Sequence, residues 1–207
     1  MRTIVVASQK GGSGKSTIAG HLGVIAEASG SGPVALLDTD PQGSLSSWWN
    51  ERKAETPVFA SADIENLAVH LKQLEEAGVE LVIIDTPPAV SETIRKVLDV
   101  ADLVLIPTRP SPHDLRAISS TVDMVKAARK RMVFVINGAA PRAKITGEAA
   151  IALSQHGTVA PVILYQRTDF AASMIDGRTV QEIDPSSRST AEIKNLWKYV
   201  FTQLREY

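Results

Sequence analysis

The chain has 207 residues, of which 44% are hydrophobic and 22% are charged, and its formal net charge is −1. This is the composition of a globular protein with one sizeable core, so we expect a single domain over residues 1–207. The net charge provides no overall basic field for nucleic acid, and the lack of cysteine excludes disulfides, thiolate zinc sites and cysteine-ligated iron–sulfur clusters. Because no signal-peptide pattern and no apolar run near the ~20 residues of a membrane span is found, we expect a cytoplasmic protein.

Short apolar runs alternate with helix-like stretches along almost the whole chain. Strands are predicted at Thr3–Ala7, Val34–Leu37, Leu81–Ile84, Leu103–Ile106, Val133–Ile136 and Val159–Leu164. Helices are predicted at Thr17–Ala28, Asp63–Ala77, Ser91–Val100, Leu115–Arg129, Gly147–Gln155, Asp169–Ile175 and Thr190–Arg205. Continuous apolar runs are typical of a parallel sheet that is covered on both faces. The pattern therefore predicts a doubly wound, mostly parallel α/β fold, with ligands at the carboxyl ends of the strands.

The run KGGSGKS lies between the first predicted strand and the first predicted helix. A glycine-rich turn at this point gathers backbone N–H groups at the positive end of the helix dipole, which is the arrangement that binds phosphate. Lys15 would reach the outer phosphates, and the Ser16 hydroxyl would bind Mg²⁺. The predicted nucleotide-binding residues of this segment are Lys10, Gly11, Gly12, Ser13, Gly14, Lys15, Ser16 and Thr17.

Two acidic segments also follow predicted strands. Asp38 and Asp40 come at the end of the second strand, and Asp85 closes the strand Leu81–Ile84. Carboxylates beside a phosphate-binding loop suit two tasks, holding Mg²⁺ through water and orienting an attacking water. Taken alone, each segment also fits an acidic turn at a strand end.

The glycine-rich loop departs from the pattern G-x-x-x-x-G-K-[ST], because Gln9 stands at the first glycine position and an extra lysine, Lys10, follows it. It resembles the deviant Walker A box, KGG-x-GK-[ST], of the ParA/MinD group of P-loop ATPases. The segments LLDTDPQGS and LVIIDTPPAV resemble the D-x-DPQG and DTPP boxes of that group. The resemblance implies ATP and Mg²⁺ as ligands and a homodimer in the ATP state, in which Lys10 reaches the partner's nucleotide. It also implies that Asp40 positions the hydrolytic water and that Asp38 and Asp85 lie near the metal ion.

Three further positions gain a role from this resemblance. The segment IPTRPSPHDLRA, with Pro107, resembles the proline-rich loop of small partition ATPases, which contributes to the dimer contact. Asn137 stands where that family places a side chain against the base, and Arg167 lies in a region that nucleotide and partner subunit both approach. Each position also has a simpler interpretation. The segment with Pro107 would be a proline-stiffened loop with Ser111 or Asp114 as the helix cap. Asn137 would be a turn residue at a strand end, and Arg167 a surface arginine.

The resemblance covers essentially the whole chain and is greatest to the short plasmid-partition ParA proteins that lack an N-terminal helix-turn-helix. It implies an ATP hydrolase that is slow without its partner, with Lys10, Lys15 and Asp40 as catalytic residues. It also implies non-specific DNA binding, nucleoid association, and a small centromere-binding or cargo-adaptor protein. The cargo, whether plasmid, chromosome or protein cluster, stays open, as does the choice of DNA-contact residues, of which Lys126–Arg131 is the densest basic cluster.

Two other functions remain open. One is a MinD-like membrane-associated positioning ATPase, since the tail carries apolar residues at helical spacing with Lys194, Lys198 and Arg205 among them; we favour instead a terminal helix packed on the sheet. The other is a small-molecule kinase or synthetase, against which Lys10 argues.

In the adjacent pair Trp48 and Trp49, we expect one indole to pack inward and the other to be partly exposed.

Overall fold

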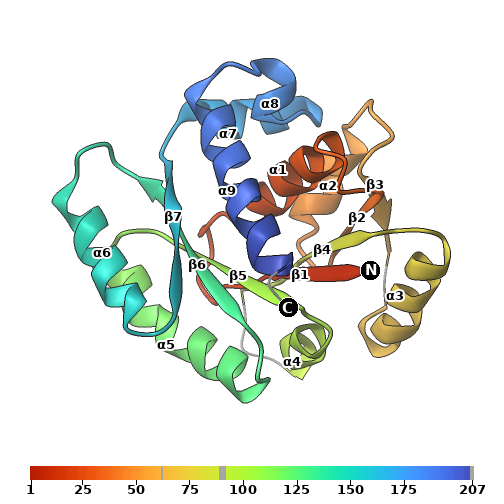
Figure 1. The fold of residues 1–207 in the computed structure, drawn as a ribbon, viewed down its shortest axis with the longest axis horizontal. Coiled ribbons are helices and arrows are strands. Elements are labelled where there is room, and N and C mark those ends of the chain that lie inside the picture. Colours follow the sequence, from red (N-terminus) through yellow and green to blue (C-terminus); the bar gives the residue numbers. More distant parts are fainter. Residues whose placement is uncertain (62, 89–91, 206–207) are drawn as a thin grey trace.

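The computed structural model describes residues 1–61, 63–88 and 92–205, which contain one seven-stranded sheet (Figure 1). The strands are β1 (Arg2–Val6), β2 (Val34–Asp38), β3 (Val58–Ala60), β4 (Leu81–Asp85), β5 (Leu103–Thr108), β6 (Met132–Ala139) and β7 (Thr158–Tyr165). They lie in the order β3-β2-β4-β1-β5-β6-β7, and all neighbouring strands are parallel. The predicted doubly wound α/β fold is confirmed.

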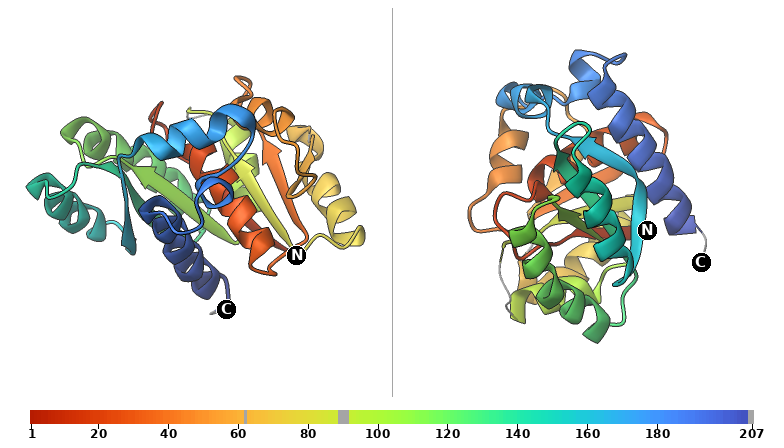
Figure 2. Two further views of the ribbon diagram at one scale, coloured as in Figure 1. Left: turned by 90° about the horizontal axis from the view of Figure 1, so that it is seen from above. Right: turned by 90° about the vertical axis from the view of Figure 1, so that its left-hand side faces the viewer.

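Helices cover both faces of this sheet (Figure 2). One face packs against α1 (Lys15–Ala28), α2 (Ser44–Asn50), α8 (Val180–Ile183) and α9 (Arg188–Arg205). The other packs against α3 (Leu67–Glu76), α4 (Glu92–Asp99), α5 (Pro112–Ala127) and α6 (Lys144–Ser154). The short helices η1 (Ile64–Asn66), α7 (Thr168–Ser173) and η2 (Met174–Asp176) lie in the connections.

The central strand β1 shows why its run from Ile4 to Val6 is apolar at every position. Ile4 and Val6 belong to the core under α1 and α9, whereas Val5 and Ala7 belong to the core on the opposite face. Because successive side chains point to opposite faces, a strand that is covered on both sides needs apolar residues at every position. The same reason makes these strands easy to predict from the sequence.

Several predicted boundaries need correction. Strand β3 was not predicted, because it has only three residues and lies at the edge of the sheet, where Val58 remains 39% exposed. The short helix α8 was also missed. Helix α5 begins at Pro112 rather than Leu115, since the Ser111 side chain accepts a hydrogen bond from the Asp114 amide and caps the helix there. The predicted helix start at Ser91 lies outside the described residues.

Pro107 was expected in a proline-rich loop, but it lies inside β5, paired in register with Val135 of β6. Leu105 turns its carbonyl toward β1, where it accepts a hydrogen bond from the Ala7 amide. Pro107, two residues further on, therefore faces the same side, beyond the last residue of β1. A proline is tolerated at this point because its missing N–H removes no bond from the sheet.

Helix α9 resolves the two interpretations of the tail. Its apolar side chains are buried in the core that covers the sheet; they are Ile193, Leu196, Trp197, Val200 and Leu204. The helix is therefore packed on the sheet, as favoured, and this apolar face is not exposed to a bilayer. No helix among the residues that the structure describes is long and apolar enough to cross a membrane.

Candidate nucleotide site

The glycine-rich loop connects β1 to α1 at the carboxyl edge of the sheet. Gly12 and Gly14 have φ values of 72° and 96°, a conformation that L side chains rarely adopt. A Cβ atom on Gly14 would also lie 2.2 Å from the Asn137 Nδ2 atom. Gly14 is the N-cap residue of α1 and has no side-chain cap, so the N–H groups of the first turn point out of the helix at the loop. The loop has the backbone that a phosphate cradle requires.

The two lysines of the loop lie in different surroundings. Lys15 is 7% exposed, and burial lowers its pKa, while the charges of Asp85 and Asp40 act in the opposite direction. Lys10 is exposed, and its contact within the described residues is a hydrogen bond from its backbone amide to the Ser8 hydroxyl at 3.3 Å. Lys15 is thus buried in the site near Asp40 and Asp85, the carboxylates that the sequence assigned to it, whereas Lys10 is exposed at the surface.

Asp85 lies at the end of β4 and is fully buried. Burial raises its pKa to about 7, and the nearby charge of Asp38 adds to this effect, whereas the hydrogen bond from Ser16 opposes it. The Ser16 hydroxyl donates that bond to Asp85 Oδ2 at 2.5 Å. The structure therefore brings together Ser16 and Asp85, two of the three residues expected at the metal, from separate motifs.

Asp38 is paired in register with Asp85 on the neighbouring strand. Its carboxylate accepts hydrogen bonds from three backbone amides, those of Asp40 at 3.0 Å, Leu45 at 3.0 Å and Ser46 at 2.9 Å. These bonds close the D-x-DPQG turn over the first residues of α2, so Asp38 has a structural role that the sequence analysis did not assign. Asp40 is held by fewer bonds within the described residues, since its carboxylate accepts a hydrogen bond from the Gln42 amide at 3.0 Å.

A cavity of about 240 Å³ adjoins the loop on the other side. Asn137, which lies within β6 rather than after it as expected, and Arg167 both line it, together with Gly14 and Thr17 of the predicted set. Asn137 Nδ2 donates to the Ser13 carbonyl at 2.7 Å, and Arg167 is paired with Glu192 of α9 at 2.6 Å. Both side chains reach the cavity, and both already have partners within the protein.

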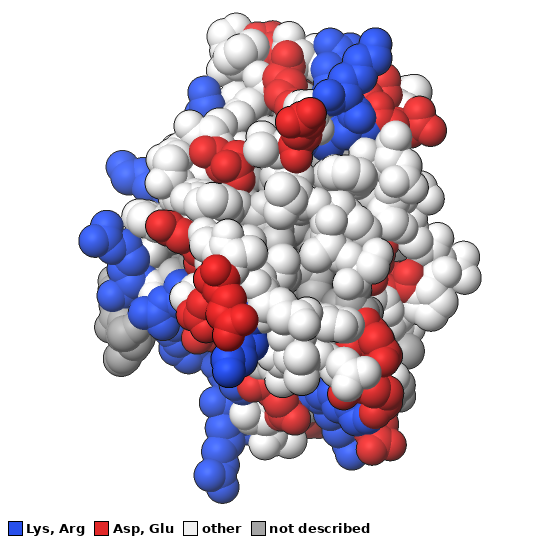
Figure 3. Space-filling model, turned by 90° about the vertical axis from the view of Figure 1, so that its right-hand side faces the viewer, with Lys and Arg blue, Asp and Glu red and all other residues white. Residues whose placement is uncertain are grey.

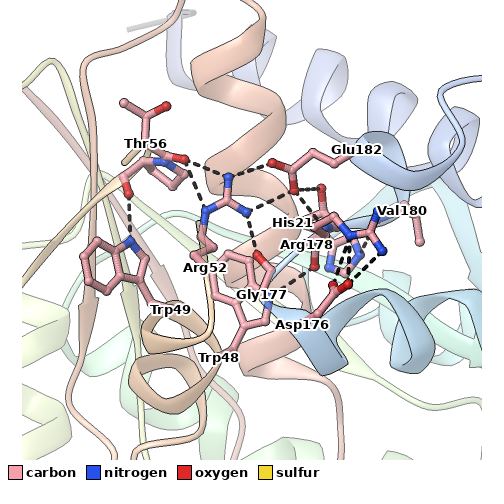
Figure 4. A network of polar contacts seen from close by, with 12 residues as sticks. His21, Trp48, Trp49, Arg52, Thr56, Asp176, Gly177, Arg178, Val180 and Glu182 are labelled. Atoms are coloured by element: carbon pink, nitrogen blue, oxygen red, sulfur yellow. Dashed lines mark hydrogen bonds and ion pairs between the residues drawn. The ribbon is translucent and has the colours of Figure 1, made fainter. Parts of the chain in front are cut away.

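A buried network missed by the sequence analysis ties α2 to the segment that precedes α9 (Figure 4). The Arg52 side chain is 3% exposed and donates to the carbonyls of Thr56 and Gly177 and to both carboxylate oxygens of Glu182. Its guanidinium also stacks on Trp48, 5.3 Å from the ring centroid. Nothing in the local sequence marks Arg52, because its partner Glu182 is 130 positions away.

The two adjacent tryptophans belong to the same region. Trp48 is 4% exposed and donates to the Arg178 carbonyl, while Trp49 is partly buried, donates to the Pro57 carbonyl and packs on Phe59. The expected pair of one inward and one partly exposed indole is confirmed. Trp49 therefore packs against β3 at the edge of the sheet, and its ring is not fully exposed to solvent.

His21 connects α1 to this network from within the core. It is 1% exposed, and its ring nitrogens lie 2.8 Å from the Thr17 carbonyl and 3.3 Å from the Val180 amide, to which Nε2 is the acceptor. Burial lowers its pKa to about 4, against smaller opposing effects of the Thr17 carbonyl and Glu182. His21 is therefore a neutral structural residue that fixes α8 against the helix that follows the loop.

The residues present fit a nucleotide with Mg²⁺. Among the described residues, the Ser13 hydroxyl is buried at the loop without a hydrogen-bond partner, which a bound phosphate would supply. No cluster of three His, Asp or Glu side chains that could hold a metal occurs in the described ranges. Mg²⁺ bound with nucleotide phosphates needs only one or two carboxylates, so Ser16, Asp85 and Asp38 suffice.

The parallel sheet, the left-handed glycines and the Ser16–Asp85 pair together define a nucleotide-binding protein of the P-loop class. The model of the CobQ/CobB/MinD/ParA nucleotide binding domain matches residues 4–180, and the chain belongs to this family. Within it, the KGGSGKS loop identifies a ParA-type ATPase with a deviant Walker A box.

Individual relatives agree with this assignment. The chain is 30% identical over 199 residues to "Maintenance of carboxysome distribution protein A" of Halothiobacillus neapolitanus, covering 92% of this chain and 91% of that protein. It is 35% identical over 127 residues to "Protein ParA" of Rhizobium radiobacter, covering 60% and 56% of the two chains. The structure of apo McdA from Cyanothece superposes with a TM-score of 0.79 at 21% identity and covers 99% of both chains, which shows the shared fold.

Proposed function

We propose that this protein is a positioning ATPase that works as an ATP-dependent dimer switch. The observation that carries the proposal is the contrast between the two loop lysines, since Lys15 is buried beside Asp40 and Asp85 while Lys10 is exposed. A site that completes its chemistry within one subunit has no need of a second, outward lysine. An exposed Lys10 is available to the nucleotide of a second copy, which also argues against a small-molecule kinase.

In this proposal the protein accelerates hydrolysis by positioning and charge stabilisation. Lys15 and the amides of the loop bind the phosphates, Lys10 of the partner copy adds a positive charge, and the Asp40 carboxylate orients the attacking water. The Asp38 carboxylate, through its bonds to the Leu45 and Ser46 amides, keeps the turn that carries Asp40 in place. Asp40 is fixed by few contacts, which suits a residue that is aligned only when partner copies meet.

Mg²⁺, when bound, neutralises charge on the phosphates. The Ser16 hydroxyl and the Asp85 carboxylate are the protein groups closest to that role, with Asp38 beside them. The pKa of Asp85, raised to about 7 by burial, shows that this carboxylate lies in surroundings that disfavour a negative charge without a cation.

We further propose that the dimer binds DNA without sequence preference and that an adaptor protein stimulates an otherwise slow hydrolysis. Such binding uses Lys and Arg contacts to phosphates. The cargo is a large object, either a DNA molecule or a protein assembly. The relative from Halothiobacillus neapolitanus, which is named for carboxysome distribution, supports a protein assembly, and the Rhizobium radiobacter relative named ParA supports DNA. The protein would then lie on the nucleoid in the cytoplasm.

DNA retardation tests the proposal. A random-sequence duplex is mixed with the purified protein and ATP, ADP or a non-hydrolysable ATP analogue, at low and moderate salt. We expect retardation only with ATP or its analogue, and a steep loss as salt rises. Equal retardation with ADP, or none in any state although the dimer forms, would contradict the DNA-binding part of the proposal. Sedimentation with anionic liposomes would then test the MinD-like alternative.

A further inference from the structure

A groove on the side of the molecule away from the nucleotide site has no role in the proposed function. It consists of two cavities of about 660 and 320 Å³, which share Gly30, Ser31, Trp197 and Phe201 and are therefore continuous. One wall is α9, and the other is formed by the end of α1, the loop after it and the first residues of β1 and β4. The start of β1 and the end of α9 lie close together here (Figure 1).

The floor of the groove is apolar. Trp197 and Leu204, 4% and 3% exposed, form its base with the partly buried Phe201, and Ile25 and Ala28 of α1 continue it. This floor is recessed between two walls, so a flat bilayer surface could not reach it, whereas a side chain inserted from a partner could. The shape favours a peptide with protruding apolar residues over a membrane.

The rim of the groove is basic. Lys194 and Lys198 line the larger cavity, and Arg2 and Arg205 line the smaller one, where Glu80 is the one carboxylate among the lining residues that the structure describes. Neither lysine forms an ion pair within the described part of the chain, while Arg2 lies 3.8 Å from Asp102. Figure 3 shows several Lys and Arg side chains along one margin of the molecule, with Asp and Glu side chains beside them. Because the whole chain has a net charge of −1, this excess of cations is local.

The groove would stay open in the dimer that we propose. Helix α1 has Lys15 at its first residue and Ala28 at its last, so the phosphate loop and the groove lie about 20 Å apart along it. The strands also show that the groove and the nucleotide site lie at opposite edges of the sheet. Arg2 and Leu81, which line the groove, begin β1 and β4, whereas Asp85 ends β4 at the nucleotide site. A dimer that meets through Lys10 and the nucleotide leaves this side of each copy accessible.

We propose that this groove binds an acidic peptide segment of a partner protein, with one or two large apolar side chains on the Trp197–Phe201 floor and carboxylates at Lys194 and Lys198. Lys194 and Lys198, with Arg205 beyond them, fit a negative partner, and the apolar floor between them fits a peptide better than a nucleic acid backbone, which would leave that floor unfilled. The accessibility of the groove in the dimer rests on the proposed function, but peptide binding itself does not, because the groove is formed by one copy.

Random 12-residue peptides displayed on phage, selected against the immobilised full-length protein, test the proposal. We expect selected peptides with a net negative charge and large apolar residues three or four positions apart. Synthetic copies should bind with similar affinity in ADP and in ATP, and at least about tenfold more weakly to the double variant Lys194→Glu, Lys198→Glu. Both lysines are exposed and outside the nucleotide site, so the variant should fold and keep its basal ATP hydrolysis.

The double variant Lys126→Glu, Lys144→Glu is the matched control, since it makes the same charge change at two exposed lysines on α5 and α6. It should bind the selected peptides as the unchanged protein does. The proposal is overturned if no peptide is selected, if the selected peptides carry no acidic excess, or if both double variants bind them equally. Loss of DNA or liposome binding in the Lys194→Glu, Lys198→Glu variant, without any effect on peptides, would also overturn it and assign the cations to those partners.

Discussion

The proposed phosphate side and the proposed base side of the nucleotide site are built in different ways. On the phosphate side, Asp38 and Asp85 end the adjacent strands β2 and β4, and Lys15 begins the helix that follows the loop after β1, so the order of strands in the sheet brings them together. On the base side, Asn137 and Arg167 come from two other strand regions and are already bonded to Ser13 and Glu192. The phosphate side is thus fixed by topology, whereas the base side depends on side-chain contacts that a nucleotide would have to share or replace.

The largest effect is expected on the phosphate side. Lys15→Ala should weaken ATP binding by about 100-fold or more, because it removes a buried charge that the protein holds next to the phosphate loop. Isothermal titration with ATP and Mg²⁺ measures this, and Lys126→Ala on α5 is the control for loss of a lysine. An unchanged affinity for ATP would remove Lys15 from the phosphate site.

The network behind the base side should matter for stability rather than for binding. Arg52→Met should lower the free energy of unfolding by about 3 kcal/mol, because it leaves the Glu182 carboxylate and two carbonyls without their partner. Chemical denaturation measures the change. Arg178→Ala, which breaks an exposed ion pair with Asp176 in the same segment, should leave the midpoint almost unchanged. An equal change in the free energy of unfolding in the two variants would show that the Arg52 contacts do not stabilise the fold more than an exposed ion pair does.

His21 should make the fold sensitive to acid. Its pKa is about 4 in the folded protein and 6.5 when unfolded, so the unfolded chain binds the proton more readily. The stabilisation that neutral, buried His21 gives the folded protein is therefore fully present above pH 6.5. It is lost as the pH falls toward 4, and the total loss is about 3 kcal/mol.

Asp85 acts in the opposite sense, since its raised pKa favours the folded state at lower pH. The test is therefore the difference in unfolding free energy between the unchanged protein and His21→Asn at several pH values. That difference should shrink from pH 7 to pH 4.5. A difference that is independent of pH would rule out the titration of His21 as its source.

The smallest effect is expected for Asn137→Ala. The amide supports the loop through one hydrogen bond to the Ser13 carbonyl, so its loss should weaken ATP binding by about 5-fold, equivalent to about 1 kcal/mol. Titrations with ATP and GTP distinguish a contact with the base from loop support. Selective loss of ATP would place Asn137 at the base, and equal loss of both would leave it as a support of the loop. A loss as large as that of Lys15→Ala would contradict the difference between the two sides.

The difference between groups placed by the sheet and groups placed by side-chain contacts also explains which features could be predicted from the sequence. The sheet and Asp85 follow from continuous apolar runs and from the order of motifs, because buried parallel strands leave a local signal. Arg52, Glu182 and His21 leave none, since each is defined by partners from distant segments. The edge strand β3 escaped prediction for a different reason, since its apolar run is only three residues long. The triple hydrogen bonding of Asp38 likewise depends on how α2 packs after the turn.

The central claim is that the exposed Lys10 serves a second copy of the chain, and light scattering after size exclusion tests it most directly. The Lys10→Ala variant and the unchanged protein are run with ADP and with a non-hydrolysable ATP analogue, and ATP binding is titrated alongside. We predict that the unchanged protein doubles in mass with the analogue, and that the variant binds ATP but stays monomeric. A variant that dimerises as readily as the unchanged protein would contradict the account.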